Sequence, residues 1–162
     1  MSSFSKGLSE QKPLEAANIQ FTPAICYEAI YPNVVSSINN DETQAILMVS
    51  NDSWFGPTRA PWQHLDMARM RSLELQKPML RCTNSGVTTI IDPQGNLEKT
   101  IAVDKEGVLS TTFKTYKGMT PYAKYGDTPV VFLMFALLIL GFISSKKKID
   151  KNNDALQKLV RP

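Results

Sequence analysis

The feature that most constrains this chain is an uncharged apolar run near its C-terminus, residues 129–145, with the sequence PVVFLMFALLILGFISS. A helix needs about 20 apolar residues, within a range of roughly 17–25, to cross a bilayer. The run lies at the short end of this range, and the apolar stem of Lys146 can extend it. A buried core helix is the alternative, but no polar face interrupts the run. The sequence therefore predicts one transmembrane helix.

Charges on the two sides of this run predict its orientation. A lysine triplet at 146–148 follows the run, whereas Tyr122 and Tyr125, typical of an interfacial aromatic belt, precede it. Because positively charged loops stay in the cytoplasm, we expect a basic cytoplasmic tail at 146–162 and an external domain before the helix. The polar N-terminus has no signal-peptide pattern. Sidedness therefore predicts that membrane helices precede these residues in a longer protein.

The composition argues against two other classes of site. The net charge is only +3, and much of the excess lies in the tail rather than on a folded face with interleaved aromatic residues, so we expect no nucleic-acid partner. The two cysteines, Cys26 and Cys82, and the one histidine, His64, lack metal-ligand spacing. We therefore expect no metal site, and we expect Cys82 to be a small buried residue.

The sequence pattern predicts one domain of mixed strands and helices at residues 1–120. A membrane-proximal segment and the transmembrane helix follow at 121–145. After a polar loop at 1–18, the predicted strands are 19–27, 45–49, 79–83, 87–92, 97–103 and 108–113. Residues 29–40 predict a short helix followed by a polar loop, and residues 62–76 predict a longer helix. The turn-rich segment 50–60 is long for a plain connection, which indicates a functional loop. This mixture indicates a layered α/β or α+β domain.

Cys26, at the end of the first predicted strand, is the residue most suited to chemistry. A thiolate attacks an ester to form a thioester, and it is released again when an amine attacks that thioester. It therefore divides one difficult transfer into two easier steps. If the strand geometry continued, Cys26 and Glu28 would face the same side. A carboxylate does not favour a neighbouring thiolate, so Glu28 would have to accept a proton, orient a lysine or position an amine. As a bare motif, Cys-Tyr-Glu is weakly specific.

The neighbouring motifs make the case for a functional role of Cys26 more specific. In chain order they are AICYE (24–28), VSNDSWFG (49–56), PWQH (61–64), MARMRSLE (67–74), RCTNSGVT (81–88), DPQG (92–95) and GMTPYA (118–123). In order and spacing, this series resembles the C-terminal part of the bacterial apolipoprotein N-acyltransferase family, which belongs to the nitrilase superfamily. The resemblance covers nearly the whole chain up to the lysine triplet.

The resemblance implies a fold, a place and a reaction. The fold is α/β, part of a nitrilase-type α-β-β-α sandwich that faces the periplasm from the bacterial cytoplasmic (inner) membrane. A phospholipid donates an acyl chain, which passes through a thioester on Cys26 to the N-terminal amine of a diacylglyceryl-cysteine lipoprotein. Tyr27 and Glu28 match positions that support this activity, and no metal or cofactor is implied. Separately from the resemblance, the position of Trp54 and Phe55 in the loop after residues 45–49 leaves two expectations open, a part in the acyl or substrate pocket and ordinary packing.

The chain departs from the family pattern at its start. The general-base glutamate, the catalytic lysine and the upstream membrane helices of the family have no counterpart in these residues, and neither Lys6 nor Lys12 suits the catalytic role. Because members of a catalytic unit act together, we expect the chain alone to be inactive. We also expect it to be poorly stable, since the missing half of the sandwich would leave sheet edges and core faces uncovered. The alternatives are a membrane-anchored amidase of the nitrilase type and a degenerate, membrane-tethered binding module.

Other polar residues are expected to be structural. His64 is interpreted as a hydrogen-bonded structural residue, and Arg69 and Arg71 as a solvated face or an internal salt bridge rather than a site for lipid phosphate. Asn84 and Ser85 either approach the active site or only form the turn between two strands.

Overall fold

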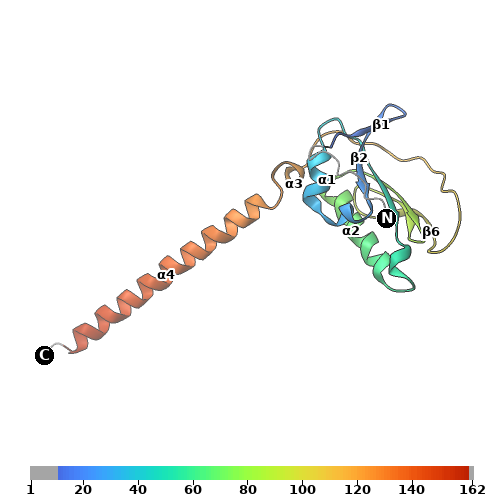
Figure 1. Ribbon diagram of the computed structural model, residues 1–162. Coiled ribbons are helices and arrows are strands. Elements are labelled where there is room, and N and C mark those ends of the chain that lie inside the picture. The colour runs from blue at the N-terminus through green and yellow to red at the C-terminus, as the bar shows by residue number, and fades with distance from the viewer. Residues whose placement is uncertain (1–10, 161–162) are drawn as a thin grey trace, which may run out of the picture. The chain divides into compact units, whose positions relative to one another are not determined.

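The computed structural model describes residues 11–160, and the chain divides into two compact units, Met1–Lys124 and Tyr125–Pro162. The first unit contains one six-stranded sheet with two α-helices packed on it (Figure 1). Its strands are β1 (Leu14–Ala16), β2 (Ile19–Ile25), β3 (Ala45–Asn51), β4 (Met79–Asn84), β5 (Thr88–Ile91) and β6 (Leu97–Ile101). Its longer helices are α1 (Pro32–Ile38) and α2 (Ala60–Leu75).

The strands lie in sequence order across the sheet, with a parallel centre and antiparallel edges. β2, β3 and β4 are parallel to one another, whereas β1 pairs antiparallel with β2, and β5 and β6 continue the sheet antiparallel beyond β4. Parallel neighbours need a crossover, and the two crossovers here contain α1 and α2. The apolar composition of β3 suits this central position, because a central parallel strand is covered on both faces.

The helices bury one face of this sheet. The core contains Ile46 and Met48 of β3, Met79 of β4, and Leu65 and Ala68 of α2. These residues come from alternate positions of each strand, as the strand period of two requires. The core therefore lies between the sheet and the α1–α2 layer.

The opposite face of the sheet is apolar but open within the described residues. Ile25, Val49 and Cys82 lie side by side in register, and Ile25 and Val49 are 62% and 45% exposed. The prediction of a buried Cys82 is therefore wrong here, because this face has no covering layer. An apolar sheet face is the surface on which a second sheet packs in a sandwich.

The central strands and helix α2 confirm the sequence predictions to within two residues, and the differences elsewhere have local causes. Residues 14–16 form β1 rather than a loop, because Ala17 and Asn18 adopt positive φ and turn the chain back on β2. The short helix predicted within 29–40 is α1, and a loop follows it as predicted. It begins only at Pro32, since Tyr31 stays extended before Pro32, as a residue preceding proline prefers.

Residues 108–113 do not form the predicted strand. Residues 102–120, all within the described part, contain neither helix nor strand and run along the domain with a few backbone hydrogen bonds. The Tyr116 amide donates to the Gln44 carbonyl at 3.3 Å, and the Gly118 amide donates to the Asp41 carbonyl at 2.8 Å. The alternating pattern of this segment therefore did not lead to strand pairing.

The second unit is dominated by helix α4 (Thr128–Val160), which follows the short helix α3 (Pro121–Tyr125). Within α4, Thr128–Lys148 spans 21 residues with a mean hydropathy of 2.2, long and apolar enough to cross a membrane. This stretch contains the predicted transmembrane run. The helix continues past the lysine triplet, so residues 146–160 are helical as well.

Candidate active site

The candidate site forms where the parallel strands end. Cys26 follows β2, Asp52 follows β3, and Asn84 is the last residue of β4. The carboxyl ends of parallel strands meet at one edge of a sheet, which is where ligands bind in open α/β folds. The Asp52 amide donates to the Asn84 carbonyl at 3.0 Å and joins two of these ends directly. The α/β topology therefore gathers three distant sequence motifs at one edge.

Cys26 occupies a tight, strained turn. Its φ is +50°, and it begins the 3₁₀ helix η1 (Cys26–Ile30) instead of continuing β2. A residue other than glycine in this region costs roughly 1–3 kcal/mol, and such residues cluster at functional sites. The turn leaves Cys26 half-buried at the carboxyl edge.

Glu28 closes this turn rather than standing beside the thiol on a continued strand. Its carboxylate accepts a hydrogen bond from the Ile25 amide at 2.8 Å, as in a capping box. The condition under which Cys26 and Glu28 would face the same side, a strand that continues past Cys26, is not met, because the strand ends at Ile25. In this geometry the carboxylate of Glu28 fixes the backbone that enters the cysteine turn.

The aromatic residues of the two motifs have different environments. Tyr27 is exposed, and its ring meets that of Tyr31 edge-on at 5.8 Å. Trp54, in the short 3₁₀ helix η2 (Ser53–Phe55), is 85% exposed, whereas Phe55 is half-buried with its ring edge-on to His64 at 5.9 Å. Of the predicted pocket pair, Phe55 therefore packs at the carboxyl edge and the side chain of Trp54 faces outward.

A buried ionic network lies beneath the cysteine turn, and the sequence analysis did not identify it. The Asp52 carboxylate accepts from Ser50 Oγ at 2.6 Å, from His64 Nδ1 at 3.0 Å and from Arg81 Nη2 at 2.8 Å. Both side chains of the Asp52–Arg81 pair are fully buried. A signal was present in the sequence, since a charged residue inside an apolar strand needs a buried partner.

Arg81 and Gly86 complete this network. Arg81 also donates to the Val87 carbonyl at 3.2 Å. Burial lowers the pKa of Arg81, while the charges of Asp52 and of Cys26 act in the opposite direction. At Gly86, an added Cβ would lie 2.3 Å from Asp52 Oδ2, so the close approach of the backbone to this carboxylate requires glycine.

His64 joins the network to the cysteine turn. It is 3% exposed, and its Nε2 lies 3.1 Å from the carbonyl oxygen of Cys26. The interpretation of His64 as a hydrogen-bonded structural residue is confirmed for its burial and bonding. Its partners come from other elements of the chain, which explains why no partner was visible in its own segment.

The two arginines of helix α2 form internal contacts. Arg71 is buried, pairs with Glu74 at 2.6 Å and donates to the carbonyl of Ala29 at 3.2 Å. Arg69 pairs with Asp66 at 2.9 Å. The internal salt bridge is therefore confirmed for Arg71, which ties α2 to the 3₁₀ helix that begins with Cys26, whereas Arg69 and Asp66 form a pair on the solvated face.

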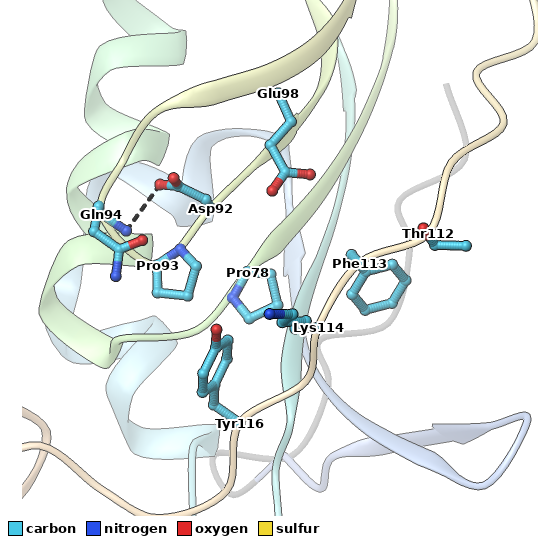
Figure 2. A pocket seen from close by; sticks show the side chains of 9 residues that line it. All are labelled: Pro78, Asp92, Pro93, Gln94, Glu98, Thr112, Phe113, Lys114 and Tyr116. Atoms are coloured by element: carbon cyan, nitrogen blue, oxygen red, sulfur yellow. Dashed lines mark hydrogen bonds between the residues drawn. The ribbon is translucent and has the colours of Figure 1, made fainter.

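One pocket adjoins the cysteine turn. It has a volume of about 600 Å³ and is lined by Ile25 and Glu28 together with residues of β1, β2 and α1 and with Gln11 and Lys12, which precede β1. A second pocket of about 430 Å³ lies between the β5–β6 turn and residues 112–116, where Asp92 accepts a hydrogen bond from the amide of Gln94 (Figure 2). The lining of this second pocket includes no residue of the cysteine turn, so the first pocket is the better candidate for substrate.

The fold and the site define a class. The sheet is of the α/β class and has Cys26 in a strained turn at its carboxyl edge. The family that the sequence matches is that of the carbon–nitrogen hydrolases. Residues 2–116 match the sequence profile of that family, so the chain belongs to the carbon–nitrogen hydrolase family. The crystal structure of a carbon–nitrogen hydrolase from Helicobacter pylori superposes with a TM-score of 0.51 at 15% identity, over 64% of this chain and 43% of that one. The described domain is thus part of a nitrilase-type α-β-β-α sandwich.

More specific similarity comes from curated relatives. The chain is 43% identical over 148 residues to the apolipoprotein N-acyltransferase of Shewanella oneidensis, which covers 91% of this chain and 29% of that protein. It is also 43% identical over 143 residues to the enzyme of the same name from Pasteurella multocida, covering 88% of this chain and 28% of that protein. The chain therefore spans less than a third of the length of these relatives and resembles one portion of them.

Proposed function

We propose that this chain is the cysteine-bearing C-terminal part of an apolipoprotein N-acyltransferase. The observation that carries the proposal is Cys26, which lies in a strained turn at the carboxyl edge of the sheet in a chain 43% identical to enzymes of that name. The relatives cover most of this chain, and α4 supplies a helix long and apolar enough to hold the domain at a membrane. Both features suit an enzyme whose acyl donor is a lipid.

The proposed reaction has two steps through a thioester. In the first, the Cys26 thiolate attacks the carbonyl carbon of a phospholipid ester, the carbon–oxygen bond breaks, and the lysophospholipid alcohol leaves with a proton. In the second, the N-terminal amine of a diacylglyceryl-cysteine lipoprotein attacks the thioester, an amide forms, and the thiolate is released as a base takes the amine proton. Neither step changes an oxidation state, so the proposal includes no cofactor.

We assign the supporting residues from their positions around the turn. Glu28 holds the backbone before the nucleophile through the Ile25 amide. Tyr27 stands exposed next to the thiol in sequence, within reach of an arriving substrate. Trp54 and Phe55 are proposed to bound the substrate region at the same edge. The pocket beside Ile25 has a mixed lining, whose apolar part is suited to contact an acyl chain.

The proposed organisation follows from the helix and its flanking charges. Residues 1–120 would form the catalytic portion on the periplasmic side, residues 121–145 would lead into and cross the inner membrane, and residues 146–162 would stay in the cytoplasm. A phospholipid donor would then reach Cys26 from the same membrane that holds α4. The acceptor lipoprotein would be bound to this membrane by its own lipid.

A polypeptide of these 162 residues alone is proposed to be inactive. The resemblance assigns the general base and the lysine of the catalytic unit to residues outside the matched portion. Removing members of such a unit normally removes most of the rate enhancement, because the members act together. The relatives extend over more than three times the matched length, which supports this division.

A chimera tests the proposal. These 162 residues would replace the matching C-terminal portion of the Shewanella oneidensis enzyme, and lipoprotein N-acylation would be measured by mass spectrometry in cells depleted of their own enzyme. We expect the chimera to restore N-acylation, and we expect its Cys26→Ala variant and the 162-residue chain alone to fail. N-acylation by the Cys26→Ala chimera at the unsubstituted rate would refute the role of the thiol.

A further inference from the structure

The ring of His64 lies between two groups that only accept hydrogen bonds. Nδ1 faces Asp52 Oδ1 at 3.0 Å, and Nε2 faces the Cys26 carbonyl oxygen at 3.1 Å. A neutral imidazole has one N–H donor, whereas an imidazolium has two. The two hydrogen bonds therefore form together only when both ring nitrogens carry a hydrogen and the ring is positively charged.

The charged groups around His64 are arranged to hold such a ring. Asp52, which follows β3, faces both His64 and Arg81, so with both ring nitrogens of His64 protonated one carboxylate would lie between two cations and the network would carry one net positive charge. Ser50 also donates to the Asp52 carboxylate, which satisfies a buried charge that would otherwise be costly. On the cysteine turn, the carboxylate of Glu28 is bound to the Ile25 amide.

The network also lies within electrostatic reach of the thiol. Burial lowers the pKa of Arg81, and the charges of Asp52 and Cys26 oppose this effect. His64 contacts the cysteine turn directly, because its Nε2 lies 3.1 Å from the backbone carbonyl oxygen of Cys26, the residue that bears the thiol. That residue has the strained φ of +50°, so a hydrogen bond to its carbonyl stabilises an unfavourable backbone conformation.

We propose that His64 is a positioning residue for Cys26: its doubly protonated ring ties the carbonyl of the strained cysteine turn to the buried Asp52–Arg81 pair and places a positive charge at the backbone of the residue that bears the thiol. The backbone bond fixes the direction in which the thiol leaves the sheet. The positive charge favours the thiolate, which is the nucleophilic form of cysteine. The inference rests on the proposed function only for the role of the thiol as nucleophile.

The first test observes the ring directly. His64 is the single histidine of the sequence, so a chain labelled with ¹⁵N-histidine and purified without a histidine tag gives one set of ring signals. In detergent micelles at pH 7, we expect two protonated ring nitrogens. The spectrum of a neutral tautomer, with one unprotonated nitrogen, would overturn the proposal without any substitution of the protein.

The second test separates a charged positioning role from simple packing. In a Cys82→Ala background, Cys26 is the only thiol, and its alkylation by iodoacetamide at pH 7 can be followed by mass spectrometry. We expect His64→Ala to slow this reaction roughly three- to tenfold, because the positive charge at the cysteine turn is removed. A purely structural role predicts the opposite result, since a loosened turn would expose Cys26 and speed its alkylation.

Two further variants complete the experiment. Gln63→Ala, an exposed neighbour on the same helix, should react at the unsubstituted rate. His64→Gln retains a donor without the charge, so it should react slowly like His64→Ala, and it serves where the alanine variant does not fold. Alkylation of both His64 variants at or above the unsubstituted rate would overturn the proposal. Neither test measures acyl transfer, so an inactive chimera would refute the proposed function and leave these results intact.

Discussion

At the scale of single residues, Gly86 is the position where the carboxyl edge of the sheet leaves least room. A Cβ there would lie 2.3 Å from Asp52 Oδ2, inside contact distance of a buried carboxylate that already binds His64 and Arg81. The carboxylate cannot move aside without losing these partners. The absence of a side chain at Gly86 is thus a condition for the network beneath Cys26.

We therefore expect Gly86→Ala to lower the free energy of unfolding by about 1–3 kcal/mol, in the range of overpacking substitutions. Denaturant unfolding of the chain in detergent, followed by near-ultraviolet circular dichroism, measures this loss. Gly107→Ala is the matched control, because its Cβ would meet only the flexible end of Ile101, at 3.3 Å. Equal effects of the two substitutions would contradict the steric argument.

At the scale of elements, Lys77 holds the irregular segment 102–120 against the sheet. Its side chain is fully buried between α2 and β4, and Nζ donates to the carbonyls of Thr43, Tyr116 and Gly118. These acceptors come from two segments far apart in the sequence. The hydrogen bonds of Lys77 therefore hold this segment on the domain in the absence of the strand pairing that the sequence predicts for residues 108–113.

Lys77→Met should destabilise the chain by about 1–3 kcal/mol at pH 7, because buried carbonyls lose their donor. Burial lowers the pKa of Lys77 to about 8, and the negative charge of Asp41 opposes this shift. In the unfolded chain Lys77 keeps its proton up to roughly pH 10.4. The unfolded chain therefore binds more protons than the folded chain between about pH 8 and 10.4. The free energy of unfolding of the wild type consequently rises with pH in this range.

The stability gap between wild type and Lys77→Met should therefore widen from pH 7 to pH 9.5. Denaturant unfolding at the two pH values checks this expectation, and the exposed Lys105→Met provides a control with little effect at either pH. A gap that narrows as pH rises would show that the charged lysine is the form the fold prefers.

At the scale of the whole molecule, the charge pattern around α4 makes a prediction about sidedness. The lysine triplet after the apolar stretch should stay in the cytoplasm, and the domain should lie outside. Two single-cysteine positions test this in a cysteine-free version of the chimera. In spheroplasts, a membrane-impermeant maleimide should label Lys105→Cys at once and Asn152→Cys only after detergent is added. The reverse pattern would mean that the positive-inside reasoning fails for this helix.

Much of the fold was predictable because its signals are local. The apolar run at 129–145 needs only its own composition to indicate a membrane-crossing helix, and the period of side chains in 62–76 needs only one helix. The continuous apolar segment at 45–49 indicates a central strand for the same reason. Cys26 itself was identified through the order of the motifs around it, which is also a property of the chain read as a sequence.

The tertiary structure alone decided what surrounds Cys26. The sequence does not indicate that the strand breaks at a φ of +50°, or that Glu28 turns back to bind the Ile25 amide. Asp52, His64 and Arg81 come from three different parts of the chain, and the parallel pairing of β2, β3 and β4 together with the packing of α2 on the sheet brings them together near the Cys26 carbonyl. The physical reason is that composition and period act along the chain, whereas burial and hydrogen bonding act between segments whose proximity the fold itself creates.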